Sequence, residues 1–484
     1  MQKKELNYFK MSTQTLKIIT SSTVVLLLNA CAVGPDYNGV PNIQYENLHN
    51  VNSNEDINNK ENLDKWWLNF NDSELEKIIE QVLKENLDLN ASLARIAQAR
   101  AVAQYAGAKL LPTVDFDANA SRIHQSLESQ NGAIASQFPG YDRNTNLYNI
   151  GMGASWEIDL FGGLRRANEA AIAQAQVAEA AHLGTRISVT AEAADAYFQI
   201  KGLQKQLNIT TNIVETNEKL LNLIKIRKEY GTANNHDIAN IEARLKSAQA
   251  NIPILKIALE SQYNRLDILI GAQAGTYSNK LIKLNDSSNI PILTSSLSVN
   301  ELLHRRPDII VAERKLVASN ANIGVATSDY YPKFSISGLL GFESMNSSNL
   351  FQSTTFQPQA IAGLRWRLFD FGKVDAQIKQ AKGVYAEELA LYKKSVLNAT
   401  QDVENAFMAL TQYKYQTELF TKKQYALNQA YKLTQADFNE GISSLVEVLI
   451  AKNDLLLSDN ELTVAKTNTF RSVVSSYRAL GGGW

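Results

Sequence analysis

The hydrophobic pattern of the chain changes from a helical period to a period of two directly after Pro112. Apolar and polar residues alternate over 114–121 and again over 148–159, as they do in a strand with one apolar face. Two segments of about ten residues suit a transmembrane barrel hairpin, in which one face meets lipid. A soluble hairpin packed on a core would alternate in the same way. The pattern therefore predicts a β-hairpin over residues 113–159.

Helical periodicity dominates the rest of the first half. Ser73 and Glu76 form a capping-box pattern at the start of one helix. The stretch from Leu164 to Tyr230 contains no proline, which predicts a helix about 100 Å long. After a turn, apolar residues at spacings of three and four continue to Leu269, the pattern of a coiled-coil seam. We expect a coiled-coil hairpin over residues 163–271.

The second half of the chain repeats the first. Trp366 follows Trp156 by 210 positions, and the same offset relates Gly441 to Gly231. Identical residues at a fixed offset, in a predicted strand and in a predicted turn, indicate an internal duplication. The predicted organisation is a first repeat over 73–271, a linker over 272–298, and a second repeat over 299–484 with a β-hairpin at 333–369 and a coiled-coil hairpin at 372–480.

Four strands per chain cannot close a barrel, and an open sheet in lipid leaves unpaired backbone groups that each cost several kcal/mol. Several chains must therefore contribute strands to one barrel. Three chains would supply twelve strands and twelve long helices, with approximate sixfold symmetry from the duplication. The predicted fold class is an internally duplicated α+β membrane protein, with four transmembrane β-strands per chain in a trimeric 12-stranded barrel that a long α-helical barrel continues.

Residues 1–30 resemble a secretory signal peptide, in which basic residues precede an apolar run too short to span a bilayer. The segment Leu28-Asn29-Ala30-Cys31 resembles the bacterial lipobox, whose cysteine becomes lipidated, and the chain has no other cysteine. An ordinary signal peptide with an incidental cysteine is the alternative. We expect an acylated tether over 31–72, held in outer-membrane lipid through Cys31.

Composition and spacing exclude several classes of function. The formal net charge is −1, so the chain lacks the electrostatic footprint of a nucleic-acid-binding protein. Its five histidines are scattered without metal-ligand spacing. The sequence contains no phosphate-binding glycine loop, nucleophile elbow or zinc helix. We therefore expect no cofactor, no metal, no nucleic-acid partner and no catalysis.

Six short motifs stand in a defined order along the chain: Cys31 to Tyr37, Trp66-Trp67 with Phe70, Asn86 to Ala101, Arg306-Pro307-Asp308-Ile309, Asp370-Phe371-Gly372, and the ending Tyr477 to Trp484. In this order and spacing the chain resembles the outer-membrane efflux factor family, the TolC-type channel-tunnels, in its lipoprotein branch. The likeness covers essentially all of the mature chain. It implies a homotrimer in the outer membrane, with a helical barrel in the periplasm that docks a periplasmic adaptor and an inner-membrane pump.

The turns of the two predicted coiled-coil hairpins, at 230–237 and 440–447, carry the first group of candidate site residues. Gly231 and Gly441 fit left-handed helix stops. In the family that the chain resembles, these turns form the periplasmic end and meet the adaptor. The resemblance thus implies adaptor-docking tips at Gly231, Asn234, Gly441 and Ser444. A plain helix hairpin is the alternative interpretation.

Asp237 and Glu447 each lie six residues beyond a turn glycine. Three chains would place six carboxylates near the tunnel mouth, and such a ring favours cations over anions. The resemblance implies that both are acidic residues of the periplasmic gate. Alternatively, each carboxylate only stabilises a helix N-terminus through the helix dipole. The family's gate also uses a basic residue near the second turn, where this chain has Ser443, which weakens the case for a gate salt bridge of that kind.

Two pairs of arginines, Arg165 with Arg166 and Arg365 with Arg367, lie beside the predicted strand ends. They could line the barrel or meet lipid phosphates. A solvated barrel rim is the favoured interpretation, so neither pair enters the set of candidate site residues.

The leading functional hypothesis is a passive outer-membrane channel for substrates that an inner-membrane pump and a periplasmic adaptor deliver. The alternative from another class is a structural coiled-coil lipoprotein that links the envelope layers without transport. The strand pairs and the duplication argue against it, because a tether needs neither. The sequence does not identify the transported substrates.

Overall fold

A computed structural model describes residues 32–40, 63–276, 288–291 and 305–484 of the chain. The predicted signal peptide at 1–30 and the predicted lipidation site Cys31 lie outside the described residues, as do parts of the predicted tether and linker. Within the described ranges, no helix combines the length and the apolar character needed to cross a membrane.

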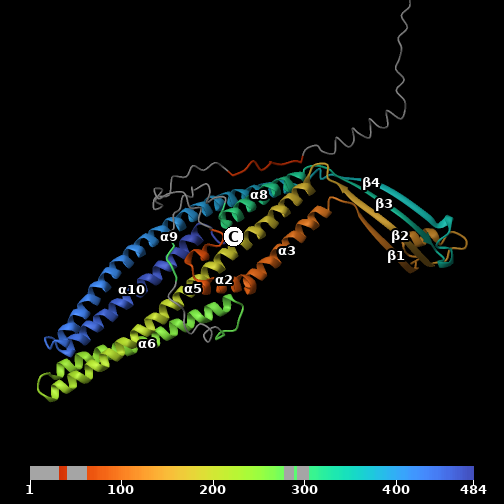
Figure 1. Ribbon diagram of the computed structural model, residues 1–484. Coiled ribbons are helices and arrows are strands. Elements are labelled where there is room, and N and C mark those ends of the chain that lie inside the picture. The colour runs from red at the N-terminus through yellow and green to blue at the C-terminus, as the bar shows by residue number, and fades with distance from the viewer. Residues whose placement is uncertain (1–31, 41–62, 277–287, 292–304) are drawn as a thin grey trace, which may run out of the picture. The chain divides into compact units, whose positions relative to one another are not determined.

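Both halves of the chain form the same series of elements (Figure 1). Paired helices have equal lengths in the two halves: α5 and α9 have 67 residues each, α6 and α10 have 35, and α3 and α8 have 22. The first half contains η1 (Trp66–Phe70), α2 (Ser73–Glu85), α3 (Leu87–Ala108), β1 (Thr113–His124), α4 (Gln130–Ala135), β2 (Asn144–Ile158), α5 (Gly163–Glu229) and α6 (Asn235–Leu269). The second contains α8 (Pro307–Ser328), β3 (Lys333–Ser344), η2 (Ser347–Asn349), η3 (Ser353–Thr355), β4 (Phe356–Arg365), α9 (Lys373–Asn439) and α10 (Leu445–Ala479). The internal duplication is confirmed.

The offset between the two halves is not constant along the chain. It is 220 between the starts of β1 and β3, and 210 between the starts of α5 and α9. The first strand hairpin, with the short helix α4 in its connection, is therefore ten residues longer than the second. The single offset of 210 expected from the sequence holds only after this loop.

The four strands form one antiparallel sheet in the order β1-β2-β3-β4. β4 ends at Arg365, four residues before the end of the β-hairpin that the sequence predicts at 333–369. The reason is the register: Arg365 pairs with Lys333, the first residue of β3, and the residues after it have no partner strand to bond. β2 continues through Trp156 because β3 still lies beside it there.

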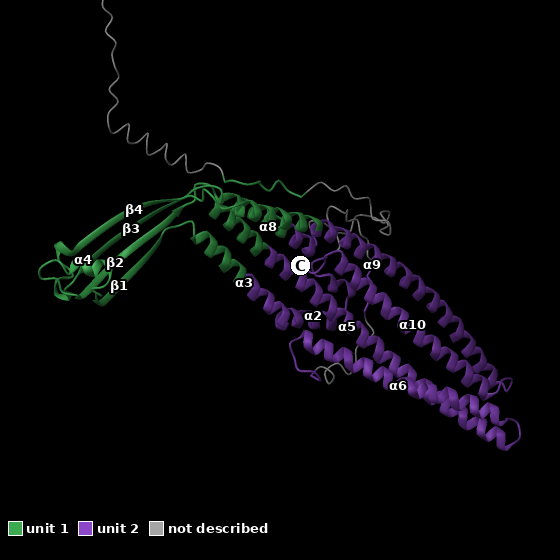
Figure 2. Cartoon of the chain, turned by 180° about the vertical axis from the view of Figure 1, so that it is seen from behind, with its two compact units in different colours: residues 1–40, 98–176, 314–390 green, residues 41–97, 177–313, 391–484 purple. Residues whose placement is uncertain are grey.

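The described chain divides into two compact units, and each unit gathers segments from both halves of the sequence (Figure 2). Of the described residues, unit 1 holds 32–40, 98–176 and 314–390, and these ranges include all four strands. Unit 2 holds 63–97, 177–276, 288–291, 305–313 and 391–484. The compact units thus do not follow the boundaries of the sequence repeats.

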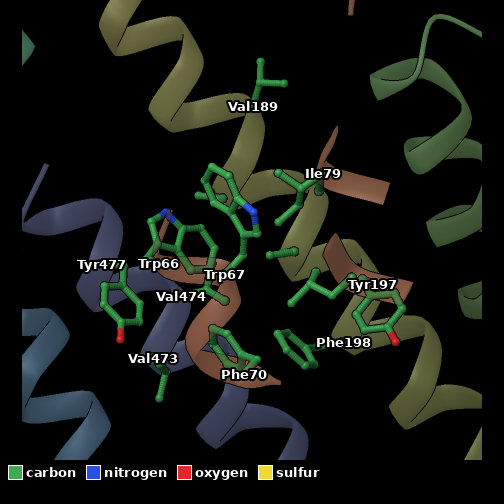
Figure 3. Packing of buried hydrophobic residues seen from close by; sticks show 14 of the residues in the cluster. Trp66, Trp67, Phe70, Ile79, Val189, Tyr197, Phe198, Val473, Val474 and Tyr477 are labelled. Atoms are coloured by element: carbon green, nitrogen blue, oxygen red, sulfur yellow. The ribbon is translucent and has the colours of Figure 1, made fainter. Parts of the chain in front are cut away.

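The largest hydrophobic cluster lies in unit 2 and is built around aromatic side chains (Figure 3). Trp66 is fully buried and stacks on Tyr477, with ring centroids 5.3 Å apart. Phe198 stacks on Phe470 at 4.7 Å and packs against Phe70 at 4.9 Å. Burying rings of this size removes about 150–250 Å² of surface each from water. The short helix η1 is therefore held between the long helices α5 and α10 by its aromatic residues.

Arg306 ties the start of α8 to the two helices α9 and α10. Its guanidinium forms a bidentate pair with Asp308, at 3.0 and 2.8 Å, and contacts the carboxylate of Asp402 at 2.9 Å. It also donates to the backbone carbonyl of Ala479 at 3.0 Å. Pro307 follows as the first residue of the helix, where its missing N–H costs nothing. The Arg-Pro-Asp motif is thus a structural anchor in unit 2.

Asp72 caps helix α2, and the predicted capping box of Ser73 with Glu76 is wrong by one residue. One carboxylate oxygen of Asp72 accepts from the backbone N–H groups of Glu74 at 3.1 Å and Leu75 at 3.3 Å. The sequence suggests Ser73 as the cap. In the structure, Asp72 has the extended conformation that an N-cap requires, and Ser73 is the first residue of the helix.

The second oxygen of Asp72 holds three more donors. It accepts from the hydroxyl of Tyr197 at 2.8 Å, from Lys201 Nζ at 3.2 Å, and from the hydroxyl of Ser288. Burial alone would raise the pKa of Asp72, but the hydrogen bonds from Ser288 and Tyr197 and the charge of Lys201 lower it below its usual value. The ionised carboxylate therefore joins α2, α5 and residue 288.

Replacing Asp72 by Asn should lower the free energy of unfolding by about 3 kcal/mol at neutral pH, because buried donors lose a charged acceptor. A carboxyl whose folded pKa is depressed stabilises the fold above its unfolded pKa of about 3.9, and this contribution disappears as pH falls through the folded value. The difference between wild type and D72N should therefore be full at pH 5–7 and shrink below about pH 4. Urea unfolding of detergent-solubilised protein measures it, and the exposed Asp454, replaced by Asn, is the control. A difference that stays constant down to pH 3 contradicts this account.

Candidate functional site

The two faces of the sheet differ sharply in chemistry. The register places Phe116, Met152 and Leu340 side by side across three strands, and their exposed fractions are 64%, 56% and 62%. The next row, on the opposite face, contains Asp117 and Gln357 with two glycines between them. Large apolar side chains exposed over a whole face mark a surface that something apolar covers. The alternation matches a strand with one face toward lipid and one toward water.

The sheet also has two open edges. β1 pairs only with β2, and β4 pairs only with β3, among the strands that the structure describes. The outer edge of β1 thus presents a row of backbone groups over twelve residues, and that of β4 over ten. In the hydrocarbon core of a membrane such an edge costs several kcal/mol for each unpaired group. The sheet of one chain is therefore an incomplete structure in lipid.

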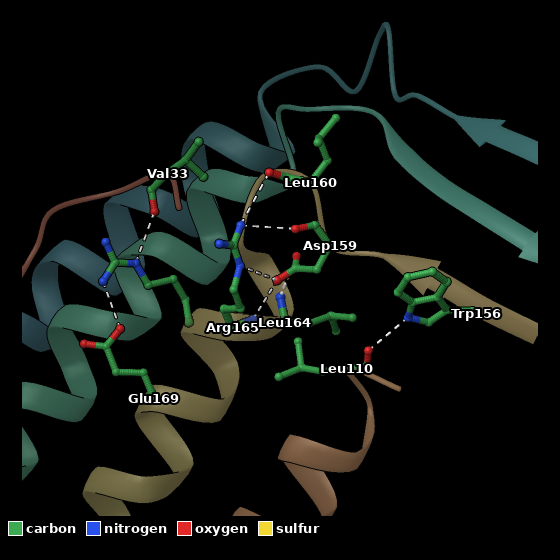
Figure 4. Close-up of polar contacts among 9 residues, drawn as sticks. Val33, Leu110, Trp156, Asp159, Leu160, Leu164, Arg165 and Glu169 are labelled. Carbon is green, nitrogen blue, oxygen red and sulfur yellow. Dashed lines mark hydrogen bonds and ion pairs between the residues drawn. The ribbon is translucent and has the colours of Figure 1, made fainter. Parts of the chain in front are cut away.

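The junction between β2 and α5 is held by side-chain hydrogen bonds (Figure 4). The carboxylate of Asp159 accepts from the backbone N–H groups of Leu164, at 3.1 Å, and Arg165, at 2.8 Å, and so caps the long helix. The indole of Trp156 donates to the carbonyl of Leu110 at 2.9 Å and ties the strand to the end of α3. These contacts fix the angle at which the strand leads into the helix.

The second repeat builds a similar junction, but its capping aspartate, Asp370, stands one position later in the repeat than Asp159. Asp370 accepts from the backbone N–H groups of Gly372, at 3.0 Å, and Val374, at 2.9 Å. Trp366 donates to the carbonyl of Tyr330 at 3.0 Å, as Trp156 does in the first repeat. The Asp-Phe-Gly motif at 370–372 is thus a strand-to-helix cap.

Arg166 is buried, so the prediction of a solvated rim is wrong for this residue. Its side chain is only 6% exposed. Nη1 contacts Glu169 at 2.8 Å, Nη2 pairs with Asp36, and Nε donates to the carbonyl of Val33 at 3.4 Å. The partners at residues 33 and 36 lie about 130 positions away in sequence, so no local pattern could have revealed them. The neighbouring Arg165 pairs with Asp159 at 3.3 Å instead.

The tip turns are built as the sequence predicts. Gly231 and Gly441 have φ angles of +74° and +77°, the left-handed conformation that favours glycine. Beyond each glycine, a backbone N–H reaches back five residues, from Thr232 to Arg227 and from Ile442 to Asp437, at 2.8 Å in both cases. This is the Schellman pattern that satisfies the last carbonyls of a helix.

Capping boxes start the return helices and include four of the predicted site residues. Asn234 accepts from the N–H of Asp237, whose carboxylate accepts in turn from the N–H of Asn234, both at 3.0 Å. Ser444 and Glu447 exchange the same pair of bonds at 3.3 and 2.6 Å. The hydrogen bonds from the Ser444 backbone and hydroxyl lower the pKa of Glu447. The helix-capping role that the sequence left open is present, and each carboxyl also remains accessible to solvent.

The two tips lie on hairpins that pack against each other within unit 2. An apolar cluster joins Leu220 and Leu221 of α5, Ile241 of α6 and Leu449 of α10. A buried contact of 3.1 Å between the amides of Asn217 and Asn453 follows along the same seam. The two tips of one chain are therefore held together by side-chain packing.

The comparison with known proteins agrees with this geometry. The sequence profile of the outer membrane efflux protein family matches residues 78–272 and again residues 298–482. The chain belongs to the outer membrane efflux protein family. The double match coincides with the internal duplication seen in the helices and strands.

Relatives of this chain are named for export or efflux. The pyoverdine export outer membrane protein OpmQ of Pseudomonas putida is 28% identical over 87% of this chain and 88% of its own length. The toluene efflux pump outer membrane protein TtgI of Pseudomonas putida is 27% identical over 86% of each chain. Both alignments cover more than four fifths of this chain.

Solved structures show the same fold over the same extent. The outer-membrane channel OprN superposes with a TM-score of 0.81, at 30% identity, over 94% of this chain and all of the other. The open-state outer membrane channel MtrE of Neisseria gonorrhoeae gives a TM-score of 0.80, at 25% identity, over 94% of this chain and 98% of its own. This efflux protein therefore has the fold of outer-membrane channels.

The residues that the structure describes contain no cluster of three or more His, Cys, Asp or Glu side chains that could hold a metal ion. The predicted tip residues fall into two groups, one on each hairpin, and the predicted lipidation site lies outside the described residues. Sequence reasoning missed the network around Arg166. The motif from Cys31 to Tyr37 was the signal in the sequence that this segment has a role. It could not show which helices the segment contacts, because Arg166 and Asn320 lie far away in the sequence.

Replacing Asn234 by Ala should destabilise the first turn of α6 by about 1 kcal/mol, because the N-cap acceptor is lost. Amide hydrogen exchange at Asp237 should then be about fivefold faster, as that free energy implies. The neighbouring Asn235, replaced by Ala, is the matched control, since it starts the helix without serving as the cap. Equal exchange rates in the two variants would mean that the capping box does not stabilise the tip.

Proposed function

We propose that this outer membrane efflux protein is the channel subunit of a tripartite export system and passively conducts substrates that an inner-membrane pump and a periplasmic adaptor deliver. The observation that carries the proposal is the sheet with one apolar face, one polar face and two open edges. A sheet of this kind is stable in lipid only when its edges are paired in a closed barrel.

Three chains satisfy this requirement. Because each sheet has an even number of antiparallel strands, β4 of one chain runs antiparallel to β1 of the next, and the pattern continues around a ring. Three copies give a 12-stranded barrel, which falls between small barrels filled by side chains and the wide porins. The homotrimer therefore supplies both the missing edges and a water-filled lumen. Neither a cofactor nor catalysis is needed for this role.

Cys31 is the proposed point of attachment to outer-membrane lipid. Acylation would stabilise membrane binding by roughly 0.8 kcal/mol for each buried methylene. Val33 and Asp36, which follow it closely in the sequence, contact Arg166 of α5. This placement supports an anchor close to the membrane-facing part of the chain.

The tips at Gly231, Asn234, Gly441 and Ser444 are the proposed docking surface for the adaptor. Tyr230 and Ile442 are 80% and 73% exposed beside the two turns. An exposed aromatic or aliphatic side chain on a rigid turn is a suitable anchor for a partner protein. The capping boxes and glycine stops hold these side chains in a defined position.

Asp237 and Glu447 are the proposed acidic gate. Their carboxylates are accessible at the first turns of α6 and α10, and three chains would bring six of them to one end of the helical barrel. A ring of carboxylates raises the local concentration of cations and repels anions. The capping bonds use one oxygen of each carboxylate and leave its negative charge in place.

The alternative, a structural lipoprotein that links envelope layers, requires only helices and an anchor. It offers no reason for a four-stranded sheet with an exposed apolar face. The membership of an efflux protein family also favours the channel.

Purified protein should form trimers that resist heat in detergent and should open ion-conducting pores in planar bilayers. Neutralising the gate with D237N and E447Q together should lower the cation-over-anion permeability ratio about twofold or more, because the ring loses its charge. The reversal potential across a salt gradient measures this ratio, with D454N on the exposed face of α10 as the control. Wild-type trimers without conductance contradict the channel, and an unchanged ratio contradicts the gate.

Single cysteines introduced at Asn234 or Ser444 should cross-link in living cells to a periplasmic adaptor, since the acylated Cys31 leaves no other thiol. A cysteine at Ser348, in the connection between β3 and β4, is the control and should not capture the adaptor. Identification of the captured protein by mass spectrometry would also point to the companion pump and its substrates. Equal capture from all three positions contradicts docking at the tips.

A further inference from the structure

The pairing of the strands repeats with the internal duplication. In the first hairpin, Thr113 of β1 stands opposite Ser155 of β2. In the second, Lys333 of β3 stands opposite Arg365 of β4. The residues in β1 and β3 are 220 positions apart and those in β2 and β4 are 210 apart, which are the two offsets between the halves of the chain. The two hairpins therefore have the same register, and a pairing seen in one repeat can be transferred to the other.

The sheet has a second kind of strand pair, in which β2 of the first repeat meets β3 of the second. Ser155 stands opposite Ser337 there, and Glu157 stands opposite Ser335. In a closed ring of identical chains, the equivalent pair joins β4 of one chain to β1 of the next, because β4 is the counterpart of β2 and β1 is the counterpart of β3. The observed register of β2 and β3 thus predicts a register for the two open edges.

The predicted register joins opposite charges. Subtracting and adding the two offsets places Arg365 opposite the partner's Asp117, and Arg367 opposite the partner's Asp115. All four side chains lie on the polar face of the sheet, in line with the serine and glutamate positions that they replace. Opposite charges directly across from each other stabilise a pair of strands. The outer edges of β4 and β1 are therefore complementary in charge.

Neighbouring registers do not give both arginines an acidic partner. A shift by one residue turns every side chain of the strand to the other face, and it would place Arg365 opposite an apolar residue such as Phe116. A shift by two residues keeps the faces but leaves one arginine without an acid. In one direction Arg365 would meet Asn119, and in the other Arg367 would meet Thr113. The charges thus favour the same register that the duplication predicts.

The apolar face is continuous in this register as well. Trp366 comes to lie opposite the partner's Phe116, and Leu368 lies opposite the partner's Val114. In the single chain the exposed fractions are 54% for Trp366, 67% for Leu368, 64% for Phe116 and 63% for Val114. Pairs of aromatic and aliphatic side chains across two strands stabilise a sheet. The equivalent pairs of β2 and β3 are also apolar on this face.

The same register gives a partner to the residues that follow β4. β2 continues from Ser155 to Ile158 because β3 lies beside it over this stretch. The equivalent residues, 366–368, have no neighbouring strand among the strands that the structure describes, and β4 ends at Arg365. β1 of the next chain supplies that neighbour in the ring. β4 should therefore extend to Leu368 when the chains assemble.

The single chain leaves these charges available. Within the part of the chain that the structure describes, Asp115, Asp117 and Arg365 are exposed and form no ion pair or side-chain hydrogen bond. Arg365 stands directly opposite another cation, Lys333, whose own partner is Asp329 at 3.1 Å. Like charges in this arrangement destabilise a strand pair. A carboxylate on the free side of β4 offsets this repulsion, and β1 of a second copy supplies one.

We propose that β4 and β1 of neighbouring chains pair in the register of β2 and β3, and that two ion pairs on the polar face lock this register. Arg365 binds the partner's Asp117, and Arg367 binds the partner's Asp115. The inference rests on the proposed function, because it requires a barrel that several chains close. It adds the residues by which one copy recognises the edge of another.

The test is a double-mutant cycle on the stability of the trimer. The full chain is purified as wild type, Arg365→Gln, Asp117→Asn and the double variant, and the half-time of trimer dissociation in dodecyl sulfate at raised temperature is read from gels. A second cycle, which combines Arg365→Gln with Asp115→Asn, is the matched control. Asp115 lies on the same strand and the same face as Asp117, two residues away.

The expected result is coupling in the first cycle only. Arg365→Gln and Asp117→Asn should each shorten the half-time about threefold or more, because every interface of the ring loses an ion pair. The double variant should dissociate no faster than the single variants, since the second change removes a partner that is already lost. In the control cycle the two effects should multiply. Multiplying effects in the first cycle, or single variants as stable as wild type, overturn the proposal.

An exchange of charges gives a second readout. Arg365→Asp places two carboxylates opposite each other and should destabilise the trimer strongly. Adding Asp117→Arg should restore the trimer, whereas adding Asp115→Arg should not. Rescue by Asp115→Arg alone would show a register shifted by two residues, and rescue by neither would show that no ion pair locks the edge, so both results contradict the proposal.

The proposed function and this inference fail in different ways. If the wild-type chain forms no trimer in detergent, the channel assignment itself fails. If wild-type trimers form and conduct ions but neither the cycle nor the exchange couples Arg365 to Asp117, the channel stands and the proposed register is wrong.

Discussion

The structure depends on one constraint: backbone N–H and C=O groups in lipid must be bonded within protein. The four strands satisfy each other internally and leave the outer edges of β1 and β4 open. In water such edges would be a hazard for aggregation, and in lipid they would be untenable. The constraint makes a single chain incomplete and makes its oligomer obligatory. The exposed apolar face of the sheet follows from the same requirement, since it replaces a core by contact with lipid.

The long helices α5 and α9, of 67 residues each, are stabilised in a different way from the sheet. In proteins, most of the stability of a helix comes from the packing of one face and not from the helix alone. Their stability comes from packing, and unit 2 concentrates that packing in an aromatic cluster around Trp66 and around the buried guanidinium of Arg306. Toward the tips the packing continues in smaller apolar clusters and a buried amide pair. The tips therefore combine rigid turns with side-chain packing between the two hairpins.

Buried charges in this chain have structural uses that differ in kind. Asp72 joins helix α2 to α5, and Arg306 joins three helices, each within unit 2. Arg166 instead holds a segment that has no secondary structure and is adjacent in sequence to the predicted lipidation site. A pair of this kind contributes little when it is exposed and much when one partner would be left buried alone. The burial of Arg166 is the reason why the N-terminal segment has a defined position.

The sequence by itself determined the elements, the duplication and the tips. Period-two alternation, long stretches without proline, and glycines at a constant offset are local properties, so they predict strands, helices and turns with bounds correct to within a few residues. The capping boxes at Asn234 and Ser444 are local as well, because each joins residues three positions apart. The end of β4 and the packing of Arg166 depend on which distant segment lies beside them, so only the tertiary structure decided them. A solvated arginine and a buried one look alike in sequence, since burial is set by partners about 130 residues away.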